Sequence, residues 1–354
     1  MPKIIKRFIL CALREFRYRK NFKKLNLNKN FVLQKSKNKR FVLFGSPEYN
    51  NLGDHAIAYS ILKFLHSYFP NIEILEIPES EILNNPDSVL KSLHSTDIIC
   101  LIGGGNFGNE YTDQRLIRNV AISLLKDNPI VIFPQSVFYT KNIIGQIAFA
   151  HDKKIIKMHK NISVFLRDKF SFAFLQSKLK NSNIYCTPDI VLSLTNSITI
   201  PKLSRKGVLL CLRNDIESKL KETDVTFLRN KFSSYTEKDT CLPYDIPIFQ
   251  RNAEINHFLL DLTNYKLVIT DRLHCAIFCA ITQTPCITFS NYNHKIKGIM
   301  EWLSNCQYIF LCESISCFDE ILNKINSNPH TYALDMWDSS FQPLIDVFSR
   351  LVNN

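Results

Sequence analysis

The chain has 354 residues, of which 45% are hydrophobic and 12% aromatic, with only nine glycines. This composition excludes fibrous and intrinsically disordered proteins and allows two core-forming domains of ordinary size. A formal net charge of +12 would favour a nucleic-acid partner if it were spread over the surface. Residues 1–40, however, contain 14 lysines and arginines and one acid, whereas the other 314 residues contain 30 basic and 31 acidic groups. We therefore predict a nearly neutral body with a basic N-terminal arm.

Apolar residues of this arm recur at helical spacing and share one face: Ile4, Ile5, Phe8, Ile9, Ala12, Leu13 and Phe16. A basic amphipathic helix of this kind can lie in a lipid interface with its cations toward anionic headgroups. The apolar run is too short and too charged to span a bilayer, and no small-residue cleavage site follows it. We expect a cytoplasmic protein associated peripherally with the inner membrane through residues 1–24. Packing of the helix on the protein's own body and binding of nucleic acid are the alternatives.

Short apolar runs alternate with helical stretches, which is typical of parallel sheets flanked by helices. We expect strands at 41–45, 73–77, 97–103, 129–133, 161–167, 207–213, 266–270 and 284–289, and helices at about 113–125, 142–160 and 251–263. A helix is expected to start at Asp54, and Asp168 is predicted to cap another. The polar stretch 194–206 is interpreted as a linker.

The predicted fold class is therefore α/β, with two Rossmann-like domains facing a cleft. The predicted N-terminal domain covers 41–195 and the predicted C-terminal domain 207–335. The basic arm at 1–40 precedes them, and a C-terminal helix at 336–354 follows.

Eleven cysteines occur, most of them inside apolar runs where a free thiol behaves as a small hydrophobic side chain. An odd number of cysteines without a cleavable signal indicates a reducing compartment. No Cys-x-x-Cys pair is present, so we expect buried, inert thiols and no metal site.

Five loops that follow predicted strands have unusual compositions, at 46–54, 103–108, 134–136, 167–168 and 271–274. Ligands of open α/β sheets bind beyond the carboxyl ends of the strands. A glycine-rich loop such as 103–108 at a helix start lets backbone N–H groups approach an anion or a sugar, although an ordinary tight turn has the same composition. No loop fits the dinucleotide fingerprint or the P-loop, which argues against an NAD enzyme or a nucleoside triphosphatase.

Arg272 and His274 stand two residues apart at a predicted strand-to-helix turn. Arginine offers a planar fork for carboxylate or phosphate, and histidine can give or take a proton near neutral pH. Together they predict a site for an anionic substrate that requires proton transfer, with a hydrogen-bonded structural histidine as the alternative.

The ordered set of short motifs at 50–54 (NNLGD), 102–106 (IGGGN), 134–136 (PQS), 167–168 (RD), 188–189 (PD), 270–274 (TDRLH) and 293–295 (NHK) resembles the polysaccharide pyruvyl transferase family over about residues 41–300. The resemblance implies a two-domain fold of the GT-B type. It also implies transfer of the enolpyruvyl group of phosphoenolpyruvate to sugar hydroxyls, usually as a pyruvate ketal, with no cofactor and no metal.

The resemblance also implies roles for particular residues. Arg272, Leu273 and His274 correspond to the family's Arg-Leu-His element, in which His274 supplies the acid. A second donor-binding arginine corresponds to Arg167, with Arg213 as the competing candidate, and Lys295 is a further candidate for the donor phosphate, or part of a solvated turn. Candidates for acceptor binding are Asn51, Asp54, Gly104, Gly105, Asn106, Gln135 and Asp189; for Asp54 and Asp189 a helix cap or turn is the alternative.

The predicted function is transfer of pyruvate to a galactose-type or hexosamine residue of an undecaprenyl-linked oligosaccharide, in bacterial capsule, exopolysaccharide or cell-wall polymer synthesis. One alternative is a nucleotide-sugar-dependent glycosyltransferase, for which only Glu301 is a candidate to bind a ribose. A non-catalytic carbohydrate-binding protein on the same fold is the other.

Overall fold

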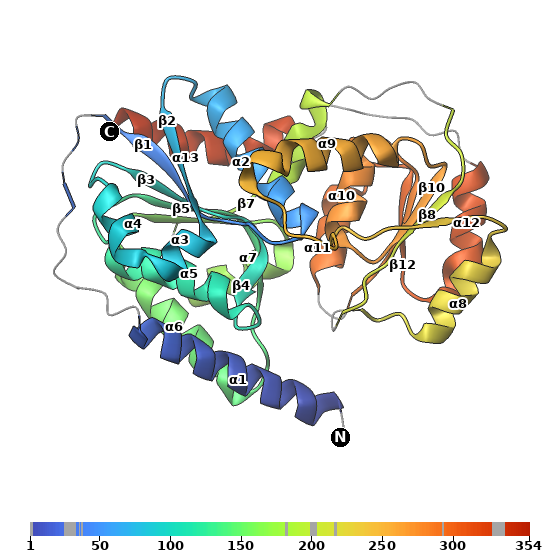
Figure 1. The fold of residues 1–354 in the computed structure, drawn as a ribbon, viewed down its shortest axis with the longest axis horizontal. Coiled ribbons are helices and arrows are strands. Elements are labelled where there is room, and N and C mark those ends of the chain that lie inside the picture. Colours follow the sequence, from blue (N-terminus) through green and yellow to red (C-terminus); the bar gives the residue numbers. More distant parts are fainter. Residues whose placement is uncertain are drawn as a thin grey trace. The chain divides into compact units, whose positions relative to one another are not determined.

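The structure is a computed structural model that describes residues 3–24, 33–34, 36, 38–180, 183–198, 204–215, 218–291, 294–327 and 337–354. The chain divides into two compact units, each with its own parallel sheet (Figure 1). Unit 1 comprises Met1–Glu48, Ile57–Ile190 and Ser340–Asn354, and unit 2 comprises Tyr49–Ala56 and Val191–Ser339. The predicted α/β class with two parallel sheets is confirmed.

Unit 1 contains a sheet with the strand order β2-β1-β3-β5-β6-β7, in which β4 pairs with β5. Every pairing in it is parallel. The strands are β1 (Arg40–Ser46), β2 (Glu73–Pro78), β3 (Ile98–Leu101), β4 (Gly104–Gly108), β5 (Ile130–Phe138), β6 (Ile162–Leu166) and β7 (Asn183–Cys186). Because the inner strands are buried on both faces, they are apolar along most of their length rather than alternating.

Helices cover both faces of this sheet: α2 (Leu52–Tyr68, with its first turn in unit 2), α3 (Glu79–Asn84), α4 (Pro86–Ser92), α5 (Thr112–Leu124), α6 (Ile143–Met158), α7 (Lys169–Lys178) and α13 (Gln342–Asn353). Side chains of β1 alternate between the two layers. Val42 and Phe44 belong to the core beneath α3, α4 and α5. Phe41 instead packs edge-on against Phe348 of α13. The last helix of the chain thus completes the core of unit 1.

Unit 2 contains a second parallel sheet with the order β12-β11-β10-β8-β9. Its strands are β8 (Val208–Cys211), β9 (Thr236–Glu237), β10 (Leu267–Thr270), β11 (Cys286–Phe289) and β12 (Ile309–Cys312). Its helices are α8 (Glu222–Lys231), α9 (Arg251–Leu262), α10 (Leu273–Ile281), α11 (Lys295–Trp302) and α12 (Phe318–Ser327), with 3-10 turns at Ile248–Gln250 and Ile315–Cys317. Two further 3-10 turns, Ile190–Ser197 and Asp338–Phe341, include the positions where the chain passes from one unit to the other. Both sheets therefore share the doubly wound order 2-1-3-4-5.

The chain departs from its predicted organisation in three places. Residues 49–56 group with unit 2, because their backbone is hydrogen-bonded to the segment that follows β9. Residues 340–354 group with unit 1, where Phe348 is fully buried. The predicted linker begins too early, because Leu194 lies buried in the 3-10 turn Ile190–Ser197; its residues 199–203 are outside the described part.

The N-terminal helix α1 (Lys3–Lys24) lies across α5 and α6 of unit 1 (Figure 1). Arg115 of α5 donates to the buried Glu15 carboxylate, and its guanidinium lies 4.1 Å from the ring centroid of Tyr18. Asn119 donates to the Tyr18 hydroxyl at 3.1 Å. One face of this helix therefore packs on the protein's own body, as the alternative to membrane docking predicted. On the residues that the structure describes, no helix is both long and apolar enough to cross a bilayer.

Most thiols are buried, as predicted. Eight of the eleven cysteines are buried, Cys186 and Cys241 are half-buried, and Cys317 is exposed. Burial raises the pKa of the Cys100 thiol above its ordinary value. Such thiols act as small apolar side chains.

Candidate active site

The switch point of each doubly wound sheet, where the strand order reverses, is where ligands bind in this fold. In unit 2 the switch point lies between β8 and β10, which are paired in parallel. Arg213 follows β8 by two residues, and Arg272 follows β10 by two residues. The sheet therefore brings the two arginines to the same edge.

Arg272 precedes α10 and is 8% exposed. Its backbone N–H donates to Thr270 Oγ1 at 2.9 Å, which fixes the turn. Its guanidinium donates to both carboxylate oxygens of Asp239, at 2.8 and 2.6 Å, and to Asp215 Oδ2 at 2.9 Å. Burial lowers the pKa of Arg272, but the hydrogen bond and charge of Asp239 outweigh burial and raise it above the ordinary value. Asp239 thus holds the guanidinium in one orientation.

Arg213 shares a carboxylate with Arg272. It donates to Asp215 Oδ1 and Oδ2 at 2.9 and 3.1 Å, while Asp215 Oδ2 also accepts from Arg272. The Asp215 side chain is 38% exposed. A pocket of about 550 Å³ lies beside the cluster, lined among others by Arg213, Lys238 and Asp239. The two converging guanidinium groups have the geometry that suits a carboxylate or a phosphate, and Arg213 also lines the pocket.

Asp271 anchors the loop that carries Arg213. Its Oδ1 accepts from the Arg213 backbone N–H at 2.7 Å, and its Oδ2 accepts from Ser218 Oγ at 3.1 Å. Burial raises the pKa of this carboxyl to about 6, against the lowering effect of those hydrogen bonds. Asp271 therefore positions Arg213 through its backbone.

His274 lies in the first turn of α10 and is half-buried. Its ring lies directly against the Cα of Gly53, so closely that a methyl group at that position would overlap Nδ1. Phe278, one turn further along α10, lies 6.4 Å from the His274 ring centroid. Gly53 belongs to the first predicted motif loop, which the structure thus brings to the histidine. Cys275, which follows the histidine, is fully buried.

The Asn51–Asp54 segment starts helix α2. Asn51 Oδ1 accepts from the Gly53 N–H at 3.0 Å, as a helix cap does. Asp54 Oδ2 accepts from Asn51 Nδ2 at 2.8 Å and from the Tyr49 hydroxyl at 3.0 Å. The helix begins at Leu52, two residues before the predicted start. Both predicted acceptor residues therefore have structural contacts within this loop.

His55 and Arg251 hold the same loop through hydrogen bonds. Arg251 Nε donates to His55 Nδ1 at 3.1 Å, and both side chains are buried. His55 Nε2 lies 2.7 Å from the Tyr49 carbonyl oxygen, which a nitrogen carrying its proton can reach as a donor. These contacts fix the orientation of the His55 ring and the path of the chain before Gly53.

In unit 1, three of the predicted motifs meet at Arg167. Its Nε donates to Ser136 Oγ at 2.8 Å, and its Nη1 donates to Asp189 at 2.5 Å. Arg167 is 2% exposed and Asp189 1%. Asp168 caps α7 as predicted, because its Oδ1 accepts from the Ser171 N–H. The Arg167–Asp189 pair is a closed contact within the core of the unit.

The glycine-rich motif differs from its prediction. Gly104 and Gly105 belong to strand β4, and the next helix starts only at Thr112. Gly104 has a φ of +112°, a conformation that favours glycine. The side chain of Asn106, in the same strand, accepts from Gln135 Nε2 at 3.1 Å. The motif therefore bends a strand rather than opening a helix.

The other predicted residues lie as follows. Leu273 is buried in α10, and Lys295 is buried at the start of α11. Asn293 of the last motif lies outside the described residues. Glu301, the candidate ribose ligand of the glycosyltransferase alternative, is exposed on α11. The sequence analysis did not identify Asp215 or Asp239. The position of Asp215, two residues after Arg213, is a signal that could have found it. Asp239 follows a strand of only two residues, β9, which has no clear sequence pattern.

The fold and this geometry define the class: an α/β protein with two arginines and a neighbouring histidine at the switch point of its second sheet. The sequence model of the family "Polysaccharide pyruvyl transferase" matches residues 51–294, more than half of the chain. The chain therefore belongs to the polysaccharide pyruvyl transferase family, and the resemblance found in its motifs is confirmed. It is thus a transferase of the pyruvyl transferase type.

Two relatives and one solved structure illustrate the similarity. The chain is 34% identical to "General stress protein 30" of Bacillus subtilis, over 88% of this chain and 92% of that protein. It is 28% identical to "Pyruvyl transferase 1" of Schizosaccharomyces pombe, over 76% of this chain and 71% of that protein. An uncharacterised protein of Klebsiella pneumoniae shares the fold with a TM-score of 0.55 at 19% identity, over 78% of this chain and 93% of that chain.

Proposed function

We propose that the protein transfers the enolpyruvyl group of phosphoenolpyruvate to a sugar and closes a pyruvate ketal. The acceptor is a galactose-type or hexosamine residue of an undecaprenyl-linked oligosaccharide, in the synthesis of a capsule, exopolysaccharide or cell-wall polymer. The reaction runs in the cytoplasm and needs no cofactor. Membership of the pyruvyl transferase family supports the transferred group.

The observation that carries the proposal is the Asp215 carboxylate between Arg213 and Arg272. A carboxylate already sits where two arginines converge, so the position suits the carboxylate or phosphate of phosphoenolpyruvate. Asp215 is exchangeable because it is 38% exposed, and such ion pairs contribute only about 0–1 kcal/mol. Asp239 stays in place and keeps Arg272 oriented. We propose Arg213, rather than the closed Arg167, as the second donor-binding arginine.

The proton transfer is assigned to His274, which lies in the first turn of α10, the helix that directly follows Arg272. In the proposed reaction His274 protonates the methylene carbon of phosphoenolpyruvate, and a sugar hydroxyl oxygen bonds to the adjacent carbon. A second hydroxyl then bonds to that carbon as phosphate leaves. One hydroxyl proton replaces the proton that His274 gave, and the other leaves with the phosphate. Arg272 stabilises the charge on the departing phosphate.

A direct test uses the full-length protein with phosphoenolpyruvate and a panel of undecaprenyl-linked oligosaccharides and synthetic galactosides or hexosaminides. The expected result is release of phosphate together with an acceptor whose mass has grown by one ketal-linked pyruvate. The proposal fails if no acceptor supports phosphate release while a nucleotide sugar is consumed instead.

The proposal includes docking of the N-terminal helix on the inner membrane. In α1 the buried residues Cys11, Glu15 and Tyr18 recur at i, i+4 and i+7. The residues Ile9, Leu13 and Phe16 recur with the same spacing on the opposite face and are 41%, 60% and 67% exposed.

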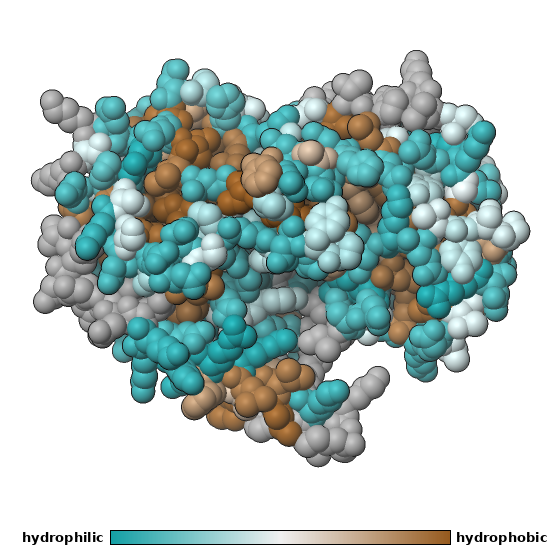
Figure 2. Space-filling view, viewed as in Figure 1, coloured by the Kyte–Doolittle hydropathy of each residue, from teal (hydrophilic) through white to brown (hydrophobic). Residues whose placement is uncertain are grey.

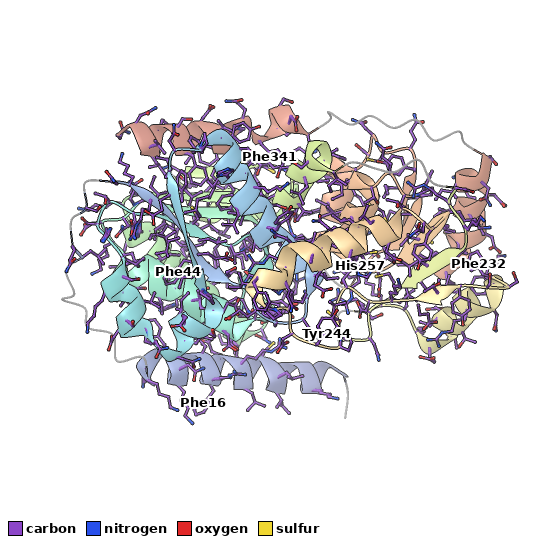
Figure 3. The ribbon with its side chains drawn as sticks, turned by 45° about the horizontal axis from the view of Figure 1, so that its top comes forward. Phe16, Phe44, Phe232, Tyr244, His257 and Phe341 are labelled. Carbon is purple, nitrogen blue, oxygen red and sulfur yellow. The ribbon has the colours of Figure 1, made fainter. Side chains whose placement is uncertain are left out.

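Apolar surface gathers along the outer side of this helix (Figure 2), and Phe16 points away from the sheet of unit 1 (Figure 3). The exposed cations Lys6, Lys20, Lys23 and Lys24 belong to the same helix. Exposed apolar side chains flanked by lysines complement an anionic lipid surface. The side chains of Ile4, Ile5 and Phe8, predicted for the same face, lie outside the described part.

Sedimentation with lipid vesicles tests the docking. Vesicles of phosphatidylcholine with phosphatidylglycerol should bind the protein, and pure phosphatidylcholine should bind it less. The double substitution L13S/F16S should weaken binding by roughly tenfold or more, because it removes the two most exposed of the apolar side chains that would enter the lipid. Phe249→Ser is the matched control, since Phe249 is 83% exposed in unit 2. Equal binding of the double variant and the unsubstituted protein would refute the docking.

A further inference from the structure

A small pocket with both polar and apolar lining lies at the switch point of unit 1, between the ends of β1 and β3. Its lining includes Gly45 near the end of β1, Ile102 after β3, and the residues Asn106, Arg118 and Gln135. Only about 10 Å³ is open to the centre of a water-sized sphere. The pocket therefore has room for one water molecule or one hydroxyl group. It occupies the place where a doubly wound sheet binds its ligand.

Gln135 lines this pocket and carries an unpaired acceptor. The side chain is 1% exposed, and its Nε2 donates to the Ile102 carbonyl at 2.6 Å and to Asn106 Oδ1 at 3.1 Å. The carbonyl contact assigns the nitrogen, because a carbonyl oxygen can only accept. Gln135 Oε1 is buried and has no hydrogen-bond partner among the described residues. A buried acceptor of this kind calls for a ligand or a water.

Arg118 lines the same pocket and carries unpaired donors. It is 4% exposed, donates through Nη1 to the Asn106 carbonyl at 3.3 Å and lies 4.2 Å from the Phe107 ring centroid. Its Nη2 is 3.8 Å from Asp152 Oδ2, an ion pair without a hydrogen bond. Within the described part of the chain, its Nε and Nη2 have no hydrogen-bond partner. Both Arg118 and Gln135 are thus fixed by Asn106 and retain unused bonding capacity.

The charges around Arg118 disfavour an anion in this pocket. Asp152 makes a bidentate contact with Arg115, which also donates to Glu15, so two arginines are balanced by two carboxylates. Glu79 adds another carboxylate to the pocket lining. A phosphate or carboxylate would meet Gln135 Oε1 and Glu79 as repulsive neighbours, whereas a hydroxyl both donates and accepts.

We propose that this pocket binds one hydroxyl group of the carbohydrate acceptor, which donates to Gln135 Oε1 and accepts from Arg118. The identification of the ligand as a sugar depends on the proposed function. Arg118 is then a specificity-determining residue that the motifs of the sequence do not include, and Gln135 gains a defined role among the acceptor candidates. A sugar without this hydroxyl, or with it in the opposite configuration, leaves both groups unsatisfied and binds less tightly.

The test measures binding directly, without turnover. The full-length protein is titrated with methyl glycosides of galactose, glucose, mannose and N-acetylglucosamine and with their monodeoxy derivatives, by calorimetry or saturation-transfer NMR. Gln135→Met removes the acceptor, and Arg118→Lys keeps the charge beside Asp152 but removes the fork. Arg115→Lys is the matched control, because it alters the same charge network without lining the pocket. Thermal unfolding checks that each variant is folded. If the Arg118→Lys variant does not fold, the affinity of the Gln135→Met variant decides the test.

Each pocket substitution should weaken binding of the preferred glycoside by about 5–10-fold, the size of one hydrogen bond. One monodeoxy derivative should bind the unsubstituted protein and both variants equally, and phosphoenolpyruvate affinity should stay unchanged. Equal glycoside affinity in Gln135→Met and the unsubstituted protein means that the pocket holds a water only and overturns the inference. Absence of binding to the whole panel overturns it too. Glycoside binding that depends on Gln135 without phosphate release would overturn the proposed function instead and leave the pocket standing.

Discussion

Each unit holds an arginine beyond the carboxyl end of a sheet strand, but the two arginines differ in the exposure of their carboxylate partners. Arg167 of unit 1 pairs with Asp189, which is 1% exposed, and Arg272 of unit 2 pairs partly with Asp215, which is 38% exposed. A buried pair cannot be opened without leaving a charge unpaired, whereas an exposed partner exchanges with solvent or ligand at little cost. The comparison separates an arginine closed within the fold from one whose partner a ligand can replace, as the proposed function requires.

The largest effect should come from breaking the closed pair. Arg167→Met leaves Asp189 as an uncompensated buried charge and should lower the free energy of unfolding by about 3–5 kcal/mol. Urea unfolding followed by circular dichroism, with hydrogen exchange of β6 peptides, measures the loss. Arg213→Met is the matched control and should change stability by no more than about 1 kcal/mol. Equal losses in both variants would remove the distinction between the two arginines.

The pH dependence of unit 2 should expose the carboxyl that positions Arg213. Burial raises the pKa of Asp271 from 3.8 to about 6, so the folded protein holds this proton more tightly than the unfolded chain. The contribution to stability is present below about pH 4 and is lost as pH rises through 6, by about 3 kcal/mol at most. Asp271→Asn should flatten this part of the stability–pH curve. Asp319→Asn, in a surface pair, should leave it unchanged. A curve with Asp271→Asn that falls as steeply as before would contradict the assignment.

Removing the Arg213 side chain should weaken donor binding without unfolding the protein. Arg213→Met should raise the dissociation constant of phosphoenolpyruvate by roughly 10–100-fold, because one of two cationic contacts is lost. Calorimetric titration measures the change. Arg205, which contacts Thr284 near the other end of β8, provides the control Arg205→Met. Donor affinity that depends on Arg167 rather than Arg213 would reverse the proposed assignment.

The contact between Gly53 and His274 should produce the smallest effect. Gly53→Ala places a methyl group against the imidazole and should slow phosphate release by roughly tenfold, because the ring must shift. Gly207→Ala is the control: its Cβ would have no neighbour within 4 Å, and its φ of +71° predicts only a stability cost. If both variants released phosphate at the unsubstituted rate, the contact would have no role in positioning His274.

Much of the fold could be predicted from the sequence because the central strands are buried on both faces. The runs 41–44 and 267–269 are continuously apolar, and they lie in β1 and β10. The two-residue strand β9 and the strand β4 have no such run, since their residues are partly exposed or rich in glycine. The grouping of 49–56 with unit 2 rests on backbone hydrogen bonds to residues 240 and 242, which no local pattern indicates.

The candidate site shows the same division. Arg272 and His274 could be predicted because they follow a strand directly and belong to one motif. Asp239, which orients Arg272, lies 33 residues away in the chain and is brought near by the pairing of β9 with β8. The orphaned donors of Arg118 could not be predicted either, because they depend on how α5 packs over β4.

The central claim is that Arg272 binds the donor and His274 protonates it, and single-turnover kinetics of His274→Ala with phosphoenolpyruvate and a competent acceptor test it most directly. Phosphate release should fall by roughly 10²–10⁴-fold while the affinity for phosphoenolpyruvate stays within a few-fold, because a general acid acts in the transition state and Arg272 remains in place. Phosphate release at the unsubstituted rate in a folded His274→Ala protein would contradict the account.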